Sequence, residues 1–353
     1  MPDDYTYIKR CLELAAKGSR HVAPNPMVGA VLVHAGRIIG EGWHRQYGGP
    51  HAEVNCIDSV KPEEAHLIGS ATMYVSLEPC SHYGKTPPCA DLIIQQKIKK
   101  VVIGCVDSFA KVNGGGIAKL RNAGVEVVLG DWQEECRTFN KRFFTFHEKK
   151  RPYIILKWAQ TANRKIAPAI QIGAHERLFI SNDLSDRLVH QWRSEEAAIM
   201  VGKNTALLDN PSLTNRLWSG KNPVRMVMDK KLELPSHLSI FNNEAKTFIF
   251  NQLKDETAGH LHYIKIAFEE NVLQQVLNQC FEHNIQSLIV EGGARLLQSF
   301  VDEGLWDECR TITAKSIVAP SGLDAPVLRN AVPVQSYNLL NDEIVFYTPV
   351  GTK

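Results

Sequence analysis

The sequence has no long apolar run, no strong excess of either charge and few cysteines. No stretch approaches the roughly 18 uncharged apolar residues of a membrane-spanning helix, so we expect no membrane partner. Lys and Arg number 40 against 38 Asp and Glu, and a net charge of +2 argues against a nucleic-acid partner. Eight cysteines in 353 residues are too few for a disulfide scaffold. We therefore expect them to be core thiols or metal ligands.

The first residues, Met1-Pro2-Asp3-Asp4-Tyr5, contain no cationic segment followed by an apolar core, which favours a cytoplasmic protein. The length of 353 residues and an apolar fraction of 44% predict two folded domains rather than a disordered chain. The polar, basic stretch 147–152 predicts the boundary, which gives domains 1–148 and 149–353. The alternative is a charged surface loop inside a single domain.

Runs with strand-like and helix-like spacing alternate in both halves. In the first half the spacing predicts helices near 4–17, 52–60, 89–96, 116–122 and 133–144, and strands at 28–33, 38–39, 72–77, 101–105 and 125–129. In the second half it predicts helices at 182–193, 269–283 and 292–303, and strands at 153–158, 198–201, 224–228, 247–250, 263–266, 287–290, 309–313 and 344–347. Strands separated by helices predict parallel or mixed sheets covered on both faces, so the fold class is α/β.

One imidazole, two thiols and a carboxyl form the strongest chemical signal. His51, Cys80 and Cys89 are three ligands for one Zn²⁺ per chain, and a catalytic zinc keeps its fourth position for water. Zinc lowers the pKa of that water to about 7. Glu53, two residues after the histidine, is placed to act as general acid and base, a pattern typical of zinc nucleobase deaminases. The alternatives are a closed structural site with His82 as fourth ligand, and histidines or cysteines with a purely structural role.

The cysteines are eight residues apart rather than the usual two, and the residues around them point to one family. Segment 79–89 reads Pro-Cys-Ser-His-Tyr-Gly-Lys-Thr-Pro-Pro-Cys, and the segments 23–29, 42–44 and 49–53 match the same family. They resemble the deaminase of riboflavin biosynthesis, and the whole chain resembles the bifunctional deaminase/reductase of that pathway. The resemblance implies an N-terminal cytidine-deaminase-like three-layer α/β/α domain and a C-terminal dihydrofolate-reductase-like α/β domain. It also implies zinc and NADPH as cofactors and a phosphorylated pyrimidine as substrate.

The resemblance further implies a deaminase pocket made by five residues: Asn25, His44, His82, Lys85 and Asp107. Asn25 would bind the pyrimidine edge, His44 and His82 the ring or ribose, and Lys85 the phosphate. The family usually reads Asp-Pro-Asn-Pro where this chain has Asp107-Ser108-Phe109-Ala110, so the amide of that asparagine is missing. Loop 113–116 either offers backbone N–H groups to an anion or forms a plain tight turn.

No Gly-x-Gly-x-x-Gly follows a strand in the second half, which excludes a Rossmann dinucleotide fingerprint. Instead, a strand ends at Glu291 and Gly292-Gly293 opens a helix, which either lets a pyrophosphate approach the backbone or simply starts the helix. By resemblance this is the NADPH loop of the reductase. The implied cofactor contacts are Gln160, Phe179, Thr205, Asp209, Gly293, Ala294, Arg295, Leu296 and Leu297. The implied substrate contacts are Lys157, Arg193, Leu213, Arg216 and Glu291. The sequence itself shows no convincing general acid for the reductase step, and Lys157 is one possibility.

Two departures affect the expected reductase. The family usually reads Ser-Leu-Asp-Gly where this chain has Thr161-Ala162-Asn163-Arg164, and Phe179 replaces a tryptophan. One alternative is therefore a deaminase whose second domain has lost redox activity and serves binding or assembly. Another is a deaminase of nucleosides or of tRNA adenosine, which the near-zero net charge disfavours. We also expect a homo-oligomer, either a dimer or a tetramer.

Overall fold

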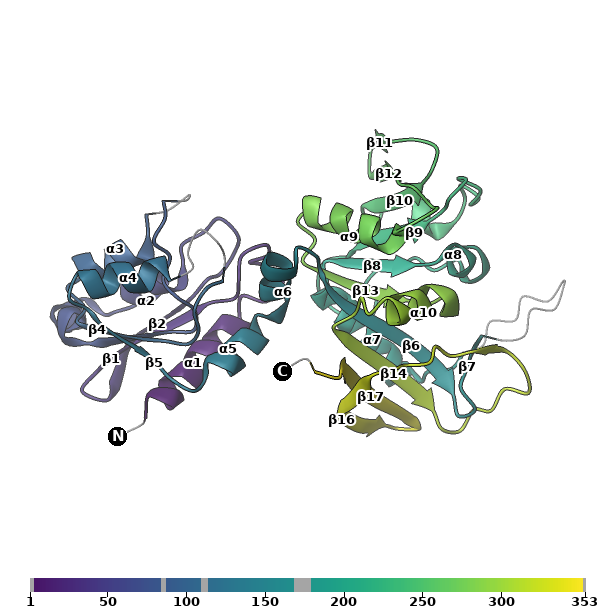
Figure 1. The fold of residues 1–353 in the computed structure, drawn as a ribbon. Coiled ribbons are helices and arrows are strands. Elements are labelled where there is room, and N and C mark those ends of the chain that lie inside the picture. Colours follow the sequence, from purple (N-terminus) through teal and green to yellow (C-terminus); the bar gives the residue numbers. More distant parts are fainter. Residues whose placement is uncertain (1–2, 84–86, 109–113, 168–178, 352–353) are drawn as a thin grey trace. The chain divides into compact units, whose positions relative to one another are not determined.

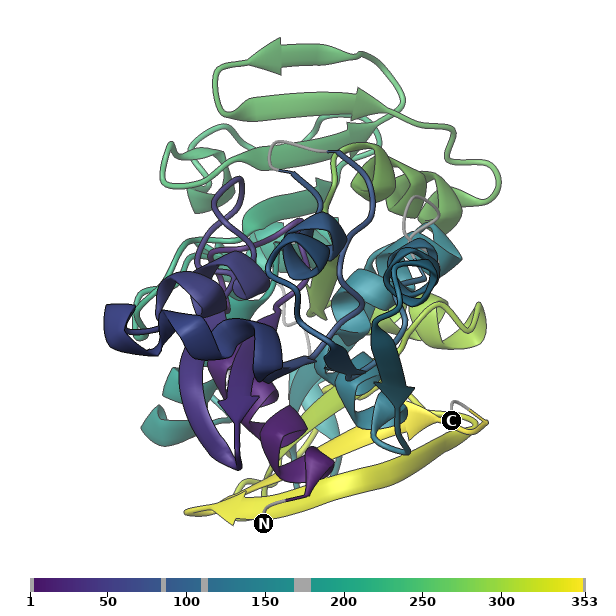
Figure 2. The same ribbon diagram turned by 90° about the vertical axis from the view of Figure 1, so that its left-hand side faces the viewer.

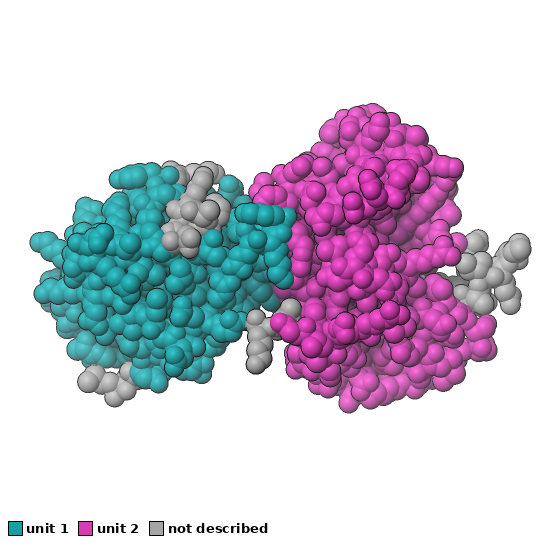
Figure 3. All heavy atoms as spheres, viewed as in Figure 1, with its two compact units in different colours: residues 1–150 teal, residues 151–353 magenta. Residues whose placement is uncertain are grey.

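The computed structural model describes residues 3–83, 87–108, 114–167 and 179–351. The chain forms two compact units, Met1–Lys150 (unit 1) and Arg151–Lys353 (unit 2), shown in different colours in Figure 3. The division falls within the charged stretch 147–152, next to the expected boundary after residue 148. Each unit is described below by itself.

Unit 1 alternates helices and strands along its described residues. In chain order these are α1 (Asp4–Ala16), β1 (Gly29–His34), β2 (Arg37–Trp43), α2 (Ala52–Asp58), η1 (Pro62–Ser70), β3 (Thr72–Val75), α3 (Cys89–Gln95), β4 (Lys100–Ile103), α4 (Gly115–Asn122), β5 (Glu126–Leu129), α5 (Gln133–Phe139) and α6 (Lys141–Lys149). The single helix expected at 133–144 is instead α5 followed by α6, because the chain leaves helical geometry at Asn140.

The sheet of unit 1 has the strand order β2-β1-β3-β4-β5. Strand β1 runs antiparallel to β2 and β3, and β3, β4 and β5 are parallel. One apolar cluster joins one sheet face to α2, α3 and α4, and a second joins the other face to α1, α5 and α6. The result is a three-layer α/β/α arrangement (Figures 1 and 2). Segments that follow β3 and β4 emerge at the same edge of the sheet, because these strands are parallel.

Unit 2 is built on a longer sheet. In chain order its described elements are β6 (Tyr153–Thr161), β7 (Lys165–Ala167), α7 (Asp183–Glu195), β8 (Ala198–Val201), α8 (Lys203–Asp209), β9 (Val224–Met228), η2 (Ser239–Phe241), β10 (Thr247–Asn251), β11 (Glu256–Ala258), β12 (Leu261–Lys265), α9 (Val272–Glu282), β13 (Ser287–Glu291), α10 (Ala294–Asp302), β14 (Glu308–Ala314), β15 (Leu323–Asp324), β16 (Ala331–Leu339) and β17 (Asp342–Pro349). The sequence did not predict β7, α8, β11, β15 or β16.

Among the described residues the main sheet of unit 2 has the strand order β11-β12-β10-β9-β8-β13-β6-β14-β17-β16. The strands from β12 to β14 are parallel, and the pairs at both edges are antiparallel. Helices α9 and α10 cover one face and α7 and α8 the other, each over its own apolar cluster. Both units are thus α/β, as the alternation of elements predicts.

Candidate active sites of the two units

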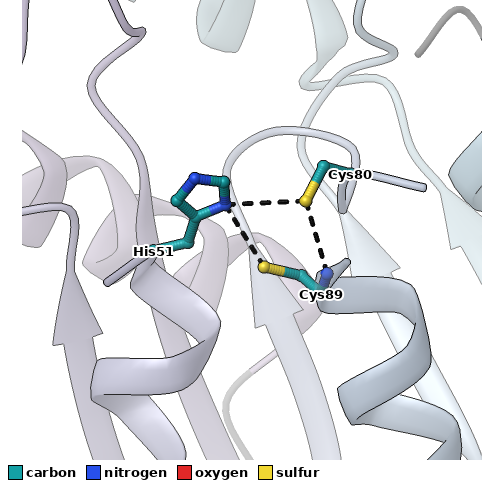
Figure 4. Close-up of side chains that lie close together, drawn as sticks. All are labelled: His51, Cys80 and Cys89. Atoms are coloured by element: carbon teal, nitrogen blue, oxygen red, sulfur yellow. Dashed lines mark hydrogen bonds between the residues drawn. The ribbon is translucent and has the colours of Figure 1, made fainter. Parts of the chain in front are cut away.

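Three side chains converge at the start of two helices in unit 1 (Figure 4). His51 is the N-cap of α2, Cys89 is the first residue of α3, and Cys80 lies in the segment between β3 and α3. The Nδ1 atom of His51 lies 3.3 Å from Sγ of Cys89 and 3.6 Å from Sγ of Cys80. The backbone N–H of Cys89 donates to Sγ of Cys80 across 3.3 Å. The fold thus brings the three expected ligands together.

This donor set fits a zinc ion. The imidazole nitrogen and the two sulfurs lie within 4.8 Å of one another, and theirs is the one such group in the described part of the chain. Hydrogen bonds from Cys89 and His51 lower the pKa of Cys80, while the contact with Cys80 and burial raise the pKa of Cys89, so the negative charge of the pair resides on Cys80. His82 is outside the group, and its buried Nδ1 atom has no hydrogen-bond partner among the described residues. Three ligands leave the open position that a catalytic zinc requires.

Glu53 is buried in the first turn of α2 beside these ligands, with 3% of its surface exposed. Burial raises the pKa of its carboxyl, while His51 and a hydrogen bond with Cys89 lower it. A carboxyl with a raised pKa suits proton exchange near neutral pH. Gly42 of β2 lets α2 pack closely, because a Cβ atom there would lie 2.2 Å from the backbone nitrogen of Cys56.

The Asn25 side chain contacts His44, and the nearby backbone at Met27 is held by Asn140. Nδ1 of His44 lies 3.0 Å from the carbonyl oxygen of Pro50 and therefore carries the hydrogen, so Nε2 accepts from the Asn25 amide across 3.1 Å. Asn140 bonds both the backbone N–H and the carbonyl oxygen of Met27, each at 2.9 Å. Both ring nitrogens of His44 are engaged, so a direct substrate contact through either would require one of these bonds to break.

Glu78 precedes Pro79 and Cys80 and occupies the N-terminus of α4. Its carboxylate accepts from the backbone N–H groups of Asp107, Gly114, Gly116 and Ile117 at 2.9–3.2 Å. The backbone N–H groups of Gly114 and Gly116, which the sequence suggested as donors to a bound anion, therefore donate to the carboxylate of Glu78. The side chain of Asp107 is buried. Lys85 and Phe109 lie outside the described residues.

A buried cluster of charges lies where β6, β13 and α7 meet in unit 2. Glu291 accepts from Nε and Nη2 of Arg193 at 2.8 and 2.7 Å, and Nζ of Lys157 lies 3.7 Å from its Oε2. Burial alone would raise the pKa of Glu291, but Arg193 and Lys157 lower it to about 2. His190, one turn before Arg193, accepts from the backbone N–H of Arg216 across 3.0 Å. Three of the five expected substrate residues, Lys157, Arg193 and Glu291, therefore gather here. Arg216 reaches the cluster only through its backbone N–H, since its exposed side chain bonds Ser212, and Leu213 is buried in the adjoining core with a φ of 54°.

The Gly292-Gly293 loop packs against α8 at the start of α10. Both glycines have positive φ, 89° and 77°, and a Cβ atom on Gly292 would lie 3.0 Å from Cγ2 of Thr205. Only residues without a side chain fit this close approach. A backbone that is bare at a helix N-terminus fits the pyrophosphate of a dinucleotide such as NADPH.

The other expected cofactor contacts differ in exposure. The Gln160 side chain is bonded by Nε1 of Trp158 at 2.9 Å and to Oγ1 of Thr313 at 3.1 Å. Asp209, Arg295 and Phe179 are exposed and Ala294 is half-buried. Leu296 and Leu297 place their side chains in the core, so only their backbone is available to a cofactor.

Residues 161–164, which depart from the family pattern, still form the turn for which the family uses a glycine. Arg164 has a φ of 61°, in the left-handed region that favours glycine, and its N–H donates to the carbonyl oxygen of Thr161 at 2.9 Å. The Asn163 side chain bonds both the N–H and the carbonyl oxygen of Ala319, at 3.1 and 2.7 Å. The substitution therefore adds strain without removing the turn.

Comparisons with known proteins agree with this geometry. Residues 1–105 match the family described as the cytidine and deoxycytidylate deaminase zinc-binding region, and residues 152–323 match the RibD C-terminal domain. The riboflavin biosynthesis protein RibD of Aquifex aeolicus is 40% identical over 320 residues, which cover 89% of this chain and 88% of that protein. The chain belongs to the RibD family.

Solved structures of RibD proteins extend the match over both units. A deaminase/reductase from Thermotoga maritima superimposes with a TM-score of 0.87 at 37% identity, covering 98% of both chains. RibD of Acinetobacter baumannii superimposes with a TM-score of 0.85 at 28% identity, covering 98% of this chain and 99% of that one. The expected fold, a cytidine-deaminase-like domain followed by a dihydrofolate-reductase-like domain, is confirmed.

RibD proteins are bifunctional deaminases and reductases of riboflavin biosynthesis, and this chain shares that function. The zinc-binding region contains the group His51, Cys80 and Cys89, and the reductase domain implies NADPH. Substrates of RibD are phosphorylated pyrimidines. In the described part of the chain, no helix is long and apolar enough to span a membrane.

Sequence reasoning missed Glu78, Asn140 and His190. A glutamate before Pro-Cys carries no local signal of its partners, which lie 29–39 residues further along the chain. Asn140 was read as part of a continuous helix, although an asparagine is a poor residue for a helix interior. His190 lies one helical turn before Arg193, and this spacing is the signal that could have identified it.

Proposed function

We propose that unit 1 hydrolytically removes an amine from a diaminopyrimidinone that carries a ribosylamino phosphate, and that unit 2 then reduces the opened ribose to a ribityl chain. The Thermotoga maritima relative is named as a diaminohydroxyphosphoribosylaminopyrimidine deaminase and 5-amino-6-(5-phosphoribosylamino)uracil reductase. The observation that carries the deaminase half is the open group of His51, Cys80 and Cys89 beside buried Glu53.

In the deaminase, the zinc ion, when held by these three residues, supplies the Lewis acidity that activates water. The Glu53 carboxylate takes one proton from the attacking water and delivers it to a ring nitrogen. It then takes the second proton from the hydroxyl group formed on the ring carbon and delivers it to the amino group, so that the carbon–nitrogen bond breaks and ammonia leaves. Its raised pKa supports this exchange. Asn25, with its amide nitrogen held by His44, turns its Oδ1 atom to the pyrimidine as an acceptor. Nδ1 of His82, which has no hydrogen-bond partner among the described residues, binds the substrate. Lys85 binds the phosphate.

In the reductase, NADPH supplies the hydride, and the chain positions the two reactants. The cofactor is bound by Thr205 and by the loop from Gly293 to Leu297, together with Gln160, Phe179 and Asp209. Glu291 keeps Arg193 and Lys157 charged and in place, and Arg216 joins Arg193 in binding the substrate phosphate. Burial lowers the pKa of Lys157, which suits its role as the donor of the proton that accompanies the hydride.

A coupled assay tests both halves. Zinc-loaded protein should release ammonia from the phosphorylated diaminopyrimidinone, and NADPH should then be oxidised in the presence of the deaminated product. Turnover of cytidine or adenosine alone would contradict the proposed substrate. Ammonia release without any NADPH oxidation would instead favour a second unit that serves binding or assembly.

The homo-oligomer and the cytoplasmic location stay predictions. Sedimentation velocity would measure the oligomeric state.

A further inference from the structure

Glu78 makes an unusually large number of backbone contacts for one side chain of unit 1. Its Oε2 atom accepts from the N–H groups of Asp107 and Gly114 at 3.2 and 3.1 Å. Its Oε1 atom accepts from Gly116 and Ile117 at 2.9 and 3.1 Å. The side chain is 4% exposed. A carboxylate can accept four such bonds, whereas a carboxamide would place two hydrogens against N–H donors.

The position of this carboxylate is also favourable. Gly114 is the N-cap of α4, so Glu78 lies at the positive end of that helix. A ligand phosphate would seek the same donors. Because Glu78 already accepts from three N–H groups between Gly114 and Ile117, the N-terminus of α4 carries an internal anion, and these three donors are already engaged.

Close packing, which involves no charge, also joins the start of α4 to residues 79–81. A Cβ atom on Gly116 would lie 1.9 Å from the carbonyl oxygen of Pro79, and one on Gly115 would lie 2.8 Å from Oγ of Ser81. The backbone N–H of Glu78 in turn donates to the carbonyl oxygen of Cys105 at 2.9 Å. The start of α4 and the end of β4 therefore both lie directly against the segment that carries Cys80.

We propose that Glu78 is a positioning residue of the deaminase. Its carboxylate holds Asp107 and the start of α4 in place against the segment that carries the zinc ligand Cys80. It contacts neither metal nor substrate. It acts by setting the place of Asp107 relative to the metal, and so governs substrate binding rather than zinc retention. This inference rests on the deaminase activity of the family and on the proposed role of Asp107 as a substrate contact.

The test is Glu78→Gln in the full-length, zinc-loaded chain. A misplacement of about 1 Å at an active site costs on the order of a hundredfold. We therefore expect the deaminase kcat/KM to fall about a hundredfold, mainly through a higher KM, while zinc stays at one per chain. The reductase activity, measured with the deaminated product, should stay unchanged and acts as an internal control. Glu126→Gln, which removes an exposed carboxylate paired with Lys100, is the matched control.

A substitution that spares Glu78 provides an independent test. Gly116→Ala pushes α4 away from Pro79 and should give the same pattern of raised KM, retained zinc and intact reductase. Gly69→Ala is its control, since a Cβ atom there lies at an ordinary 3.4 Å from the carbonyl oxygen of Gln96. The Gly116 variant remains informative if Glu78→Gln does not fold.

Three outcomes would overturn the proposal. One is a deaminase whose kcat and KM stay at wild-type values in folded Glu78→Gln, which would leave Glu78 a purely structural role. Another is zinc loss in proportion to activity, because Glu78 would then act by retaining the metal. The third is an equal fall in reductase activity. A wild-type chain inactive on the pyrimidine would instead refute the proposed substrate, so the two failures are distinguishable.

Discussion

The zinc group of unit 1 comes from residues 51–89, whereas the charged cluster of unit 2 joins residues spread from 157 to 291. In unit 1, the three converging ligand atoms are enough to indicate metal chemistry. In unit 2, Glu291, Arg193 and Lys157 are common residues whose meaning depends on the pairing of β6 with β13 and on the packing of α7. The residue types alone therefore indicate the metal chemistry, whereas the role proposed for the charged cluster depends on the fold.

The sharpest separation of the two units should come from Cys80→Ser. Loss of one soft ligand should remove zinc and lower deaminase activity by about a thousandfold or more, because attack on the ring needs activated water. The reductase should keep its wild-type rate. Metal analysis and the two activity assays measure this, with Cys280→Ser as a control that removes a buried thiol from unit 2. A variant that kept its zinc would argue against the ligand set.

The converse variant is Glu291→Gln. It leaves Arg193 and Lys157 buried without their anion, which should destabilise unit 2 by about 3 kcal/mol and abolish most reductase activity. Deaminase activity should remain. Urea unfolding gives the free energy, and Glu269→Gln, which removes an exposed carboxylate near Lys230, should change it little. An equal loss of both activities would show that the units do not act separately.

Acid should weaken the same ion pairs in the wild type. The folded pKa of Glu291 is depressed to about 2, below its ordinary value of 4.5, so its contribution to stability is full above about pH 4.5 and is lost as the pH falls towards 2. The difference in unfolding free energy between wild type and Glu291→Gln should therefore shrink across this window. A constant difference from pH 7 to pH 3 would contradict an ionised Glu291.

The smallest expected effect concerns the turn at Arg164. An L-residue with left-handed φ costs roughly 1 kcal/mol relative to glycine, so Arg164→Gly should stabilise unit 2 by about that amount. Arg164→Ala keeps the strain and removes the contact of the guanidinium with the carbonyl oxygen of Pro326, so it should not stabilise. Thermal unfolding of both variants measures the difference, and equal melting temperatures would show that the turn carries no strain.

Much of the fold was predictable because periodicity is local. The helix capped by Asn182 and the strands that line the cores follow from spacing and capping alone. Strand β16 was missed because its side chains are mostly exposed and it contains Pro333, so it lacks the apolar alternation of a half-buried strand. The break at Asn140 was missed because the low helix propensity of one asparagine is a weak signal, and the bonds that hold its side chain go to Met27, 113 residues away.

The candidate sites show the same distinction between local signals and distant contacts. His51, Glu53, Cys80 and Cys89 were identifiable because metal chemistry restricts residue type and order. The four N–H partners of Glu78 were not, because backbone donors carry no residue signature. The assignment of NADPH contacts to Leu296 and Leu297 came from resemblance, and their buried side chains leave only backbone atoms for that role.

The bonds between Asn140 and Met27 affect how this enzyme can be shortened. The matched zinc-binding region ends at residue 105, yet Asn140 secures the backbone two residues after Asn25 from the junction of α5 and α6. A fragment cut at that point would retain the three proposed metal ligands and lose the support of the loop that we propose to bind the pyrimidine. An excised deaminase should therefore extend through Lys150, the last residue of its compact unit.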